Sequence, residues 1–460
     1  MGMRLFKPES EATRFWNPYA QTMPRPELDR LHLKRLQTLI QYAYERSPLY
    51  RKLLDREKVR PAEIRTLDDF TKRLPFMDKG DVLEAQAAAP PYGDALALPE
   101  DFFLQRFATS GSTGVPFHIP LTYYSSVLWG ESWLYLLWGV GLRPRHSFYF
   151  PFHWGIFAAF WSGYMAVRRL GGTVVSGGGL DSKARITQIL QYRPDVVFCT
   201  PTYALYLGEV AREMGVDLRQ SSVAYVFVAG EPGGSIPTTQ QAIEEVWGAK
   251  CYEMYGSAEL GPTNHGCPLQ GGVHLGEEWY HALVVDEAGN PVPYGEVGEH
   301  IVTSYIQHSQ PLIKYRTHDL VRWTDEPCGC GTTWLYYPGG VLGRTDHMVI
   351  IKGVNVYPSA VEALLARVSG LSEHYEIHAG REGVNDFLSV KVEARSDVAS
   401  QRYPALKGEM ESIFRTQIGV SIGVEILPPG SLPRYELKAK RFFDHRPAGH
   451  RWQLAGRTRG

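Results

Sequence analysis

The stretch that decides the fold is Asp195-Val196-Val197-Phe198-Cys199-Thr200, which is followed by residues 203–214 and by the apolar run VAYVFVA at 223–229. A short apolar run such as DVVFCT is typical of a strand that is buried on both faces. Residues 203–214 have the pattern of a helix. A strand, a helix and a second strand in this order predict a mostly parallel sheet with helices on both faces.

The same alternation extends toward the amino terminus. Two further strands and the helix between them are predicted at residues 147–150, 173–176 and 156–170. Leucines at helical spacing predict another helix over residues 26–60, which Ser47-Pro48 interrupts. The Ala- and Pro-rich residues 81–100 are interpreted as a surface connection.

The pattern changes twice toward the carboxyl terminus. After residue 270, segments such as 279–285 and 298–304 alternate with turn residues, which predicts antiparallel hairpins. Beyond residue 346, short strands and two helices, at 359–368 and 404–418, predict a small α+β unit. The predicted fold class is α/β, with a large unit followed by a small one.

The composition limits the classes of function. The chain has 460 residues, 44% of them hydrophobic, which is enough for a sizeable core. Lys and Arg number 48 against 49 Asp and Glu, and this balance argues against a general nucleic-acid binder. We find neither an apolar run of the roughly 18 residues that a membrane helix needs nor a signal peptide. Five cysteines favour a reduced, cytoplasmic compartment.

The strongest local motif is Thr109-Ser110-Gly111-Ser112-Thr113-Gly114-Val115-Pro116. Small and hydroxyl residues in a row cannot pack a core, but they can present backbone N–H groups and hydroxyls to phosphate oxygens. The spacing is not that of a Walker A loop, which also needs a Lys. The alternative interpretation is a Ser- and Gly-rich surface loop.

Four charged residues in other motifs could carry chemistry. Glu259 follows a glycine turn and could hold Mg²⁺, or could simply begin a helix. Asp319 could accept hydrogen bonds from ribose hydroxyls, or could pair with Arg316 on the surface. Asp346 lies where the sequence pattern changes and is a natural hinge. Lys438 could reach a distant site if the small unit closes, or could belong to a solvated basic run.

The order and spacing of these motifs along the chain resemble those of the adenylate-forming superfamily. This superfamily contains acyl-CoA synthetases, luciferases and peptide-synthetase adenylation domains. The chain is most similar to the phenylacetate–CoA ligase branch. The matching motifs, which extend over nearly the whole chain, are Ser47-Pro-Leu-Tyr50, TSGSTGVP (109–116), Gly230-Glu231-Pro232, YGSAE (255–259), PLIKYRTHD (311–319), GRTDHMVIIKGVNVYPSAVE (343–362) and LPRYELKAKR (432–441).

The resemblance implies a role for each motif residue. The ATP phosphates would lie on Thr109, Ser110, Gly111, Ser112, Thr113 and Gly114. The adenine and its surroundings would contact Gly230, Glu231, Pro232, Tyr252, Tyr255, Gly256 and Ser257. Glu259 would bind Mg²⁺, and Asp319 and Arg344 would hold the ribose. Lys438, preferred over Lys440, would be the catalytic lysine, and Asp346 would be the hinge.

The implied activity is that of an AMP-forming acyl-CoA ligase. The implied fold is a large N-terminal domain of αβαβα layers with a β-rich subdomain, residues 1–345, and a small, mobile C-terminal domain, residues 346–460. A carboxylate would attack the α-phosphorus of ATP to give an acyl-adenylate and pyrophosphate, and CoA would then take the acyl group. Rotation about Asp346 would withdraw Lys438 between the two half-reactions.

Three positions depart from the pattern of the family. Val115 stands where a Lys usually precedes the proline of the loop, which weakens the electrostatic part of the phosphate grip. His318 replaces a Gly before Asp319, and Leu437 replaces a Gly before Lys438. These two changes concern the local geometry of the loops.

The segment Pro151-Phe152-His153-Trp154-Gly155-Ile156-Phe157 resembles the acid pocket of the family. The predicted pocket consists of Phe152, His153, Trp154, Phe157, Ala229, Gly261 and Pro262. Bulky walls predict a small acid, either aromatic, of the phenylacetate or benzoate type, or short and branched or hydroxylated, of the hydroxyisobutyrate type. The alternative is that the aromatic residues are ordinary core and that His153 is a core histidine.

Cysteines and a histidine in the second half of the chain form a candidate Zn²⁺ site. The candidate ligands are Cys267, His274, Cys328 and Cys330, in which a C-x-C pair adds to a distant Cys and His. The alternative is a set of free buried thiols. Cys199 and Cys251 are expected in the core.

Two other functions stay open at this point. One is an adenylating enzyme that passes the acyl group to a carrier protein or an amine, and the other is a catalytically silent nucleotide-binding protein. The expected partners are a small carboxylic acid, ATP and CoA, with no nucleic acid and no membrane. A homodimer is left open.

Overall fold

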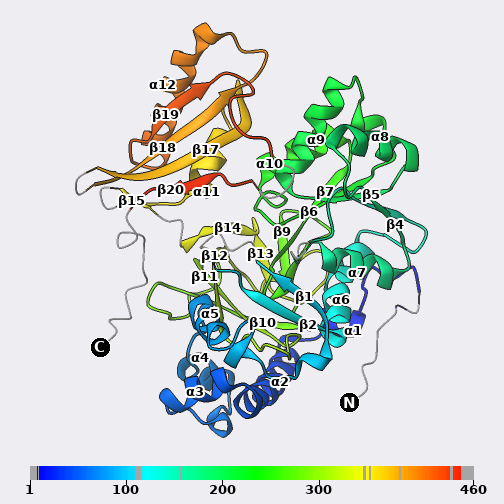
Figure 1. Cartoon of the computed structure of the whole chain (residues 1–460), viewed down its shortest axis with the longest axis vertical. Coiled ribbons are helices and arrows are strands. Elements are labelled where there is room, and N and C mark those ends of the chain that lie inside the picture. Colours follow the sequence, from blue (N-terminus) through cyan, green and yellow to red (C-terminus); the bar gives the residue numbers. More distant parts are fainter. Residues whose placement is uncertain are drawn as a thin grey trace.

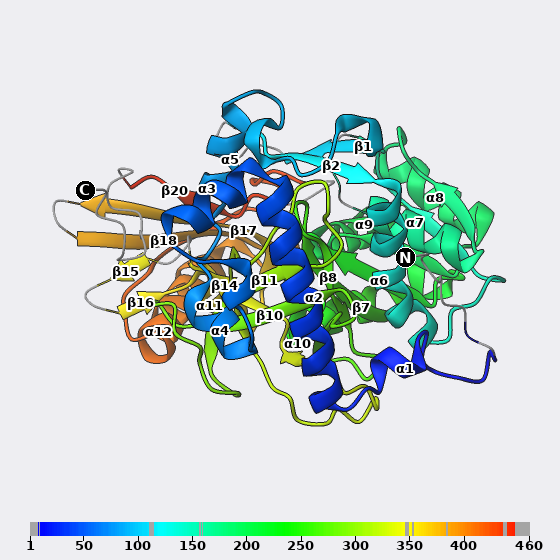
Figure 2. The same ribbon diagram turned by 90° about the horizontal axis from the view of Figure 1, so that it is seen from below.

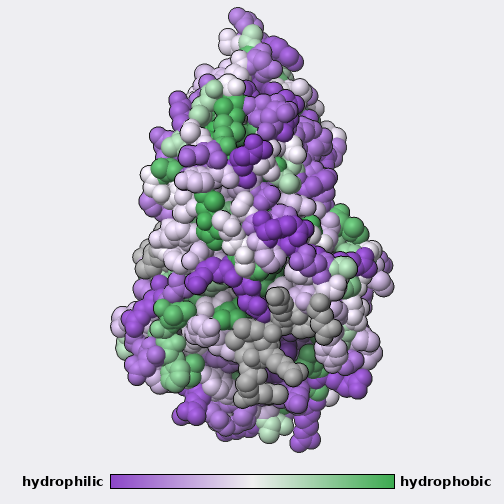
Figure 3. All heavy atoms as spheres, turned by 90° about the vertical axis from the view of Figure 1, so that its right-hand side faces the viewer, coloured by the Kyte–Doolittle hydropathy of each residue, from purple (hydrophilic) through white to green (hydrophobic). Residues whose placement is uncertain are grey.

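The computed structural model describes residues 8, 10–109, 115–155, 158, 160–345, 349–351, 354–382, 385–435 and 439–446. Within these residues the chain forms a large body up to residue 345 and a smaller body from residue 349, each with its own sheets (Figure 1). None of the described helices is long and apolar enough to cross a membrane. The face in Figure 3 is mostly hydrophilic, with small hydrophobic patches.

Helices near the amino terminus pack beneath the β-rich part of the large body (Figure 2). They are α2 (Arg25–Arg46), α3 (Pro48–Arg56), α4 (Leu67–Arg73) and α5 (Lys79–Ala87), with 3-10 turns η1 (Pro61–Glu63), η2 (Gly93–Ala95) and η3 (Glu100–Phe102). The short helix α1 (Pro18–Gln21) packs instead with α6 (Tyr123–Gly139) and α7 (Trp161–Leu170). Ser47 has an extended backbone between α2 and α3, as expected before a proline, so the predicted break is confirmed. The surface connection predicted from residue 81 is wrong for α5, which Asp78 and Asp81 start with a capping box.

An eight-stranded sheet forms the centre of the large body, in the order β13-β9-β8-β7-β6-β5-β3-β4. The strands are β3 (Ser147–Phe150), β4 (Thr173–Ser176), β5 (Val196–Cys199), β6 (Tyr225–Ala229), β7 (Lys250–Ser257), β8 (Gly261–Gly266), β9 (Gly272–Leu275) and β13 (Tyr336–Pro338). Strands β4, β3, β5, β6 and β7 are parallel, which confirms the predicted parallel sheet. Strands β8, β9 and β13 extend the sheet in antiparallel fashion.

Helices cover both faces of this sheet, as its apolar strands require. One face packs on α6 (Tyr123–Gly139) and α7 (Trp161–Leu170). The other packs on α8 (Ser182–Tyr192), α9 (Pro201–Glu213) and α10 (Pro237–Trp247), and the 3-10 turn η4 (Leu218–Gln220) lies nearby. Helix α7 starts later than the predicted residue 156, because Phe160, just before it, has a left-handed backbone (φ 60°).

The β-rich part contains a hairpin and a second sheet. The hairpin pairs β1 (Phe103–Ala108) with β2 (His118–Thr122). The second sheet has the order β10-β11-β12-β14, formed by β10 (Tyr280–Val285), β11 (Val297–Ser304), β12 (Tyr315–Arg322) and β14 (Val341–Arg344). All of its pairings are antiparallel, which confirms the predicted hairpins after residue 270.

The small body is an α+β unit with its own core. It contains β15 (Val349–Ile351), β16 (Val354–Val356), α11 (Pro358–Leu365), β17 (Leu371–Glu382), β18 (Asn385–Ala394), η6 (Ser400–Arg402), α12 (Tyr403–Gln417), β19 (Gly423–Leu427) and β20 (Phe442–Asp444). Its main sheet has the order β19-β18-β17-β20. In Figure 1 this orange and red unit lies beside α9 and α10 of the large body.

Candidate active site

The base of the predicted phosphate loop is closed by two hydrogen bonds between its flanks. The Thr109 amide donates to the Phe117 carbonyl at 3.0 Å, and the Phe117 amide donates to the Thr109 hydroxyl at 3.0 Å. These bonds continue the β1–β2 hairpin, so the loop emerges from a fixed base. Ser110, Gly111, Ser112, Thr113 and Gly114 lie outside the described residues.

Glu259 lies in the turn between β7 and β8, so its alternative interpretation as a helix start is wrong. The Tyr315 hydroxyl donates to Glu259 Oε1 at 3.0 Å, and Gln307 Nε2 donates to the Glu259 carbonyl at 3.1 Å. A partly exposed carboxylate on a fixed turn is a suitable ligand for Mg²⁺. Sequence reasoning missed Tyr315, although it lies in the same motif as Asp319.

Asp319 is buried and receives two charge-assisted hydrogen bonds. Arg344 Nη1 donates to Asp319 Oδ1 at 2.7 Å, and the Tyr255 hydroxyl donates to Oδ2 at 2.7 Å. Asp319 and Arg344 face each other across β12 and β14. The alternative pairing of Asp319 with Arg316 is wrong, because Arg316 pairs with Glu299. The structure thus brings the predicted ribose pair together and adds Tyr255 to it.

His318 occupies the position where the family usually has glycine, and it adopts the backbone that glycine favours (φ 62°). Its ring nitrogens lie 3.4 Å from Glu299 Oε1 and 3.5 Å from Asp78 Oδ2. These contacts hold a residue that rarely adopts this conformation. The geometry before Asp319 is therefore kept without glycine.

The predicted adenine loop follows β6 and rests on a buried acid that sequence reasoning missed. Glu253 of β7 accepts hydrogen bonds from the Ser235 side chain and the Gly233 amide, while burial raises its pKa to about 7. The carboxylate of Glu231 accepts from the Thr202 amide at 2.8 Å, at the start of α9. Gly230, in the same loop, has a left-handed backbone (φ 93°).

The structure does not bring Tyr252 and Tyr255 to one side of the sheet. They are three residues apart on one strand, and successive strand side chains point to opposite faces. The Tyr252 ring packs in the core beneath α6 and its hydroxyl donates to the Pro268 carbonyl at 3.3 Å. We therefore leave Tyr252 out of the candidate site, whereas Tyr255 remains in it.

An aromatic cluster surrounds the predicted acid-pocket segment. The ring centroid of Trp154 lies 5.3 Å from that of Phe152, 4.9 Å from that of Trp161 and 5.0 Å from that of Tyr164. His153 is exposed, so its interpretation as a core histidine is wrong. Phe157 lies outside the described residues.

The three remaining predicted pocket residues are small or cyclic and lie at the ends of β6 and β8: Ala229, Gly261 and Pro262. A Cβ atom on Gly261 would lie 2.3 Å from Nε1 of Trp129, so only glycine fits there. Trp129 stacks on Phe107 with ring centroids 6.0 Å apart. Sequence reasoning missed both of these rings, since they come from α6 and β1 and neither belongs to a motif.

The small body contacts the large one through a few polar groups. His374 Nε2 lies 3.0 Å from Oε1 of Glu209 on α9, and Arg434 Nε lies 3.8 Å from Glu209 Oε2. The Ala439 amide donates to Glu231 Oε2 at 3.1 Å. Ala439 follows Lys438 directly, so the loop with the predicted catalytic lysine meets the predicted adenine loop.

Two predicted residues of this region, Lys438 and Asp346, lie outside the described residues. The competitor Lys440 places its ammonium group 4.9 Å from the ring centroid of Phe443, within the small body. This contact is compatible with the preference for Lys438.

The predicted metal-binding cysteines and histidine also meet. The ligand atoms of Cys267, His274, Cys328 and Cys330 all lie within 4.8 Å of one another. Cys199 and Cys251 are buried in the core, as predicted.

The profile of the family described as "AMP-binding enzyme" matches residues 47–307, and that of the "AMP-binding enzyme C-terminal domain" matches residues 353–446. The chain belongs to the AMP-binding enzyme family. A phenylacetate-coenzyme A ligase of Thermus thermophilus is 34% identical over 94% of this chain and 99% of its own length. The chain is an AMP-forming acyl-CoA ligase, which uses ATP and CoA and acts through an acyl-adenylate.

Two structures of one ligase show which arrangement of the two bodies this chain resembles. The 2-hydroxyisobutyryl-CoA ligase in the postadenylation state with R3-HIB-AMP is 31% identical, covers 95% of this chain and 93% of that chain, and superposes with a TM-score of 0.89. The same ligase with CoA in the thioesterification state covers 95% of both chains at 31% identity but gives a TM-score of 0.72. Because the coverage is so similar, we attribute the difference to domain arrangement, and this chain resembles the postadenylation one.

Proposed function

We propose that this AMP-forming acyl-CoA ligase activates an aromatic acid of the phenylacetate type. The observation that carries this proposal is the aromatic cluster of Trp154, Phe152, Trp161 and Tyr164 at the predicted acid pocket, which would pack against an aryl group. The relative from Thermus thermophilus, a phenylacetate-coenzyme A ligase, supports the same class. The second candidate is a short hydroxylated acid, which the likeness to 2-hydroxyisobutyryl-CoA ligase favours.

A competition between acids tests this proposal. Pyrophosphate release and CoA thioester formation would be measured with phenylacetate, benzoate and 2-hydroxyisobutyrate. We expect kcat/KM for phenylacetate to exceed that for 2-hydroxyisobutyrate by about 100-fold or more, equivalent to about 2.7 kcal/mol of differential transition-state binding. A preference for 2-hydroxyisobutyrate would assign the hydroxylated class instead.

The proposed first half-reaction uses groups of the large domain to hold ATP. Asp319, fixed by Arg344 and Tyr255, would accept the ribose hydroxyls. The main chain of the loop at Gly230 would contact the adenine, and the hairpin loop that begins at Thr109 would hold the phosphates. Glu259 would hold Mg²⁺, which supplies charge neutralisation at the phosphate oxygens when bound.

Lys438 is the residue that we propose to neutralise charge where the acid attacks the α-phosphorus. A Lys438→Ala variant should lose adenylation by about 10²-fold or more, while it still converts a supplied acyl-adenylate to the thioester. Lys440→Ala, two residues away, is the matched control and should keep both half-reactions. Unchanged pyrophosphate release from Lys438→Ala would refute the assigned role.

Several other sequence predictions stay proposals. We propose the domain boundary at residues 345 and 346, with Asp346 as the hinge of a mobile C-terminal domain. The five cysteines, which all lie within the described residues, form no disulfide, and this supports a cytoplasmic, reducing environment. The homodimer stays a prediction. The second predicted metal, Zn²⁺, belongs to the separate Cys/His cluster.

A further inference from the structure

We propose that Cys267, His274, Cys328 and Cys330 bind one Zn²⁺ ion, which joins loops of the large domain and takes no part in the ligase chemistry. Cys267 lies just after β8, His274 lies in β9, and the C-x-C pair lies in the loop before β13. Zn²⁺ favours four such sulfur and nitrogen ligands. We call these four residues the zinc cluster.

Two distances within the zinc cluster are close to the edges of a tetrahedron around Zn²⁺. Cys267 Sγ lies 3.6 Å from Cys328 Sγ, and Cys330 Sγ lies 3.5 Å from His274 Nε2. Metal bonds of about 2.3 Å to sulfur and about 2.05 Å to nitrogen give tetrahedral edges of about 3.8 Å and 3.5 Å. A disulfide needs sulfur atoms about 2.05 Å apart, much closer than these two.

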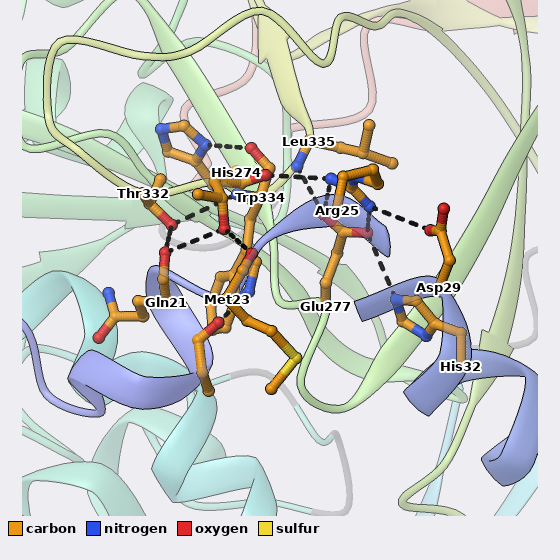
Figure 4. Close-up of polar contacts among 12 residues, drawn as sticks. Gln21, Met23, Arg25, Asp29, His32, His274, Glu277, Thr332, Trp334 and Leu335 are labelled. Carbon is orange, nitrogen blue, oxygen red and sulfur yellow. Dashed lines mark hydrogen bonds and ion pairs between the residues drawn. The ribbon is translucent and has the colours of Figure 1, made fainter. Parts of the chain in front are cut away.

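Neighbouring groups orient the ligands. His274 Nδ1 lies 3.3 Å from the Trp334 carbonyl oxygen (Figure 4), so Nδ1 carries the proton and Nε2 is left to bind a metal. The Leu269 amide donates to Cys267 Sγ at 3.4 Å. The Gly331 amide donates to the Cys328 carbonyl at 2.8 Å and closes the C-x-C turn.

Burial and charge also fit a structural ion. Cys267, His274 and Cys330 are buried, and Cys328 is half-buried. Three thiolates and a neutral imidazole around Zn²⁺ leave a net charge of −1. Four protein ligands complete the tetrahedron, so no position is left for a substrate or a catalytic water.

The zinc cluster lies where three segments of the large domain meet. Its C-x-C loop runs into Thr332 and Trp334, which donate to the carbonyls of Gln21 and Ala20 at 2.9 Å each. Figure 4 shows this amino-terminal segment beside His274. An ion here would therefore hold the β8–β9 turn, the loop before β13 and, through that loop, the start of the chain.

A cavity of about 290 Å³ borders the zinc cluster. His274 and Cys330 contribute to its wall, together with Arg14, Tyr135 and His265. This cavity gives the ion, or a chelator, a path to the ligands.

Metal analysis of the wild-type protein tests the proposal directly. The protein would be purified under reducing conditions without added metal or a metal-binding tag, and zinc would be measured by mass spectrometry. We expect about one Zn²⁺ per chain, and its release when a mercurial blocks the thiols. The proposal would be overturned if the protein contained less than about 0.1 Zn²⁺ per chain and took up none in a Zn²⁺ titration. A Cys267–Cys328 disulfide in protein purified under these reducing conditions would also overturn it.

Single-cysteine variants separate a bound ion from an adventitious one. Cys330→Ser should lose most of the zinc and lower Tm by about 5 °C or more, because the ion stabilises only the folded chain. Cys199→Ser, a buried cysteine outside the zinc cluster, is the control and should keep its zinc. Equal zinc content per chain in Cys330→Ser and Cys199→Ser would overturn the proposal. If Cys330→Ser does not fold, the zinc content of the wild-type protein decides between the outcomes.

Discussion

Two carboxylates of the large domain, Asp319 and Glu277, are more deeply buried than Glu209, which contacts the small domain. Asp319 and Glu277 are buried, and each is paired with an arginine, Arg344 and Arg25 respectively. Glu209, which contacts His374 of the small domain, keeps 25% of its side chain exposed. Water can replace the partner of an exposed carboxylate at little cost, whereas a buried one that loses its partner is strongly destabilised.

This difference separates ion pairs that lie within the large domain from contacts between the two domains. Asp319 and Glu277 both have their arginine partners within the large domain. The contacts at Glu209 and Glu231 belong to the arrangement seen here, which superposes on the postadenylation state of a related ligase with a TM-score of 0.89 and on its thioesterification state with 0.72. Partly exposed contacts such as those of Glu209 would suit the domain movement that we propose.

The largest effect is expected from Asp319→Asn. Loss of the charge removes the partner of Arg344 and weakens the acceptor proposed for the ribose, so adenylation should fall by about 10²-fold or more. Pyrophosphate release at varied ATP concentrations measures this effect. Asp325→Asn, an exposed aspartate after the same strand, is the control, and equal activity of the two variants would contradict the role proposed for Asp319.

Glu277→Gln should show how much a buried, paired carboxylate contributes to folding. Burial opposes ionisation, but hydrogen bonds from Arg25 and His32 hold the pKa of Glu277 at about 2 (Figure 4). The stabilisation is therefore present above the ordinary pKa near 4.5 and is lost as pH falls toward 2. At pH 7 the variant should lose about 3 kcal/mol in the free energy of unfolding.

Denaturant unfolding at pH 7 and pH 3 measures this contribution. The difference in the free energy of unfolding between wild type and Glu277→Gln should be smaller at pH 3 than at pH 7. Glu287→Gln, an exposed position on the next turn, is the matched control and should lie within about 0.5 kcal/mol of wild type. If this difference in the free energy of unfolding did not change with pH, the result would contradict an ionised Glu277 paired with Arg25.

Glu253→Gln should have the opposite dependence on pH. Burial raises the pKa of Glu253 to about 7, so the carboxyl group favours the folded state below the ordinary pKa of 4.5, and this contribution is lost as pH rises to 7. The variant cannot ionise. Its Tm relative to wild type should therefore rise between pH 5 and pH 8, by an amount equivalent to about 3 kcal/mol or less.

The smallest effect is expected from Glu209→Gln, at the face that meets the small domain. Loss of the charge opposite His374 and Arg434 should slow adenylation by about threefold to tenfold, since partly exposed pairs contribute about 1 kcal/mol. Conversion of a supplied acyl-adenylate to the thioester should not change. Glu213→Gln, exposed on the same helix, is the control, and an equal loss in both half-reactions would contradict a contact specific to one arrangement.

Sequence patterns predicted the elements with a continuous apolar run or with apolar residues at helical spacing. The strands β5 and β6 follow from their apolar runs, and the helix between them follows from its helical pattern. Asp319 could be named because its motif resembles that of the family, and the zinc cluster because a C-x-C pair adds to a distant Cys and His. The residues named in the phosphate loop after Thr109, with Asp346 and Lys438, stay predictions.

The parts that could not be predicted depend on long-range packing. Glu209 and His374 are 165 residues apart and belong to no shared motif. Nothing in the sequence indicates that His318 would adopt a left-handed backbone, because Asp78 and Glu299, which its ring contacts, come from other elements. The placement of Tyr252 away from the site, by contrast, follows from strand alternation, a rule that the sequence already offered.

The position of Arg344 at the end of β14 has a mechanical consequence. The strand that presents this arginine to Asp319 is also the last one before the chain crosses to the small domain. A shift of Arg344 would therefore also shift the strand that leads to the small domain, because side chain and strand share one piece of backbone.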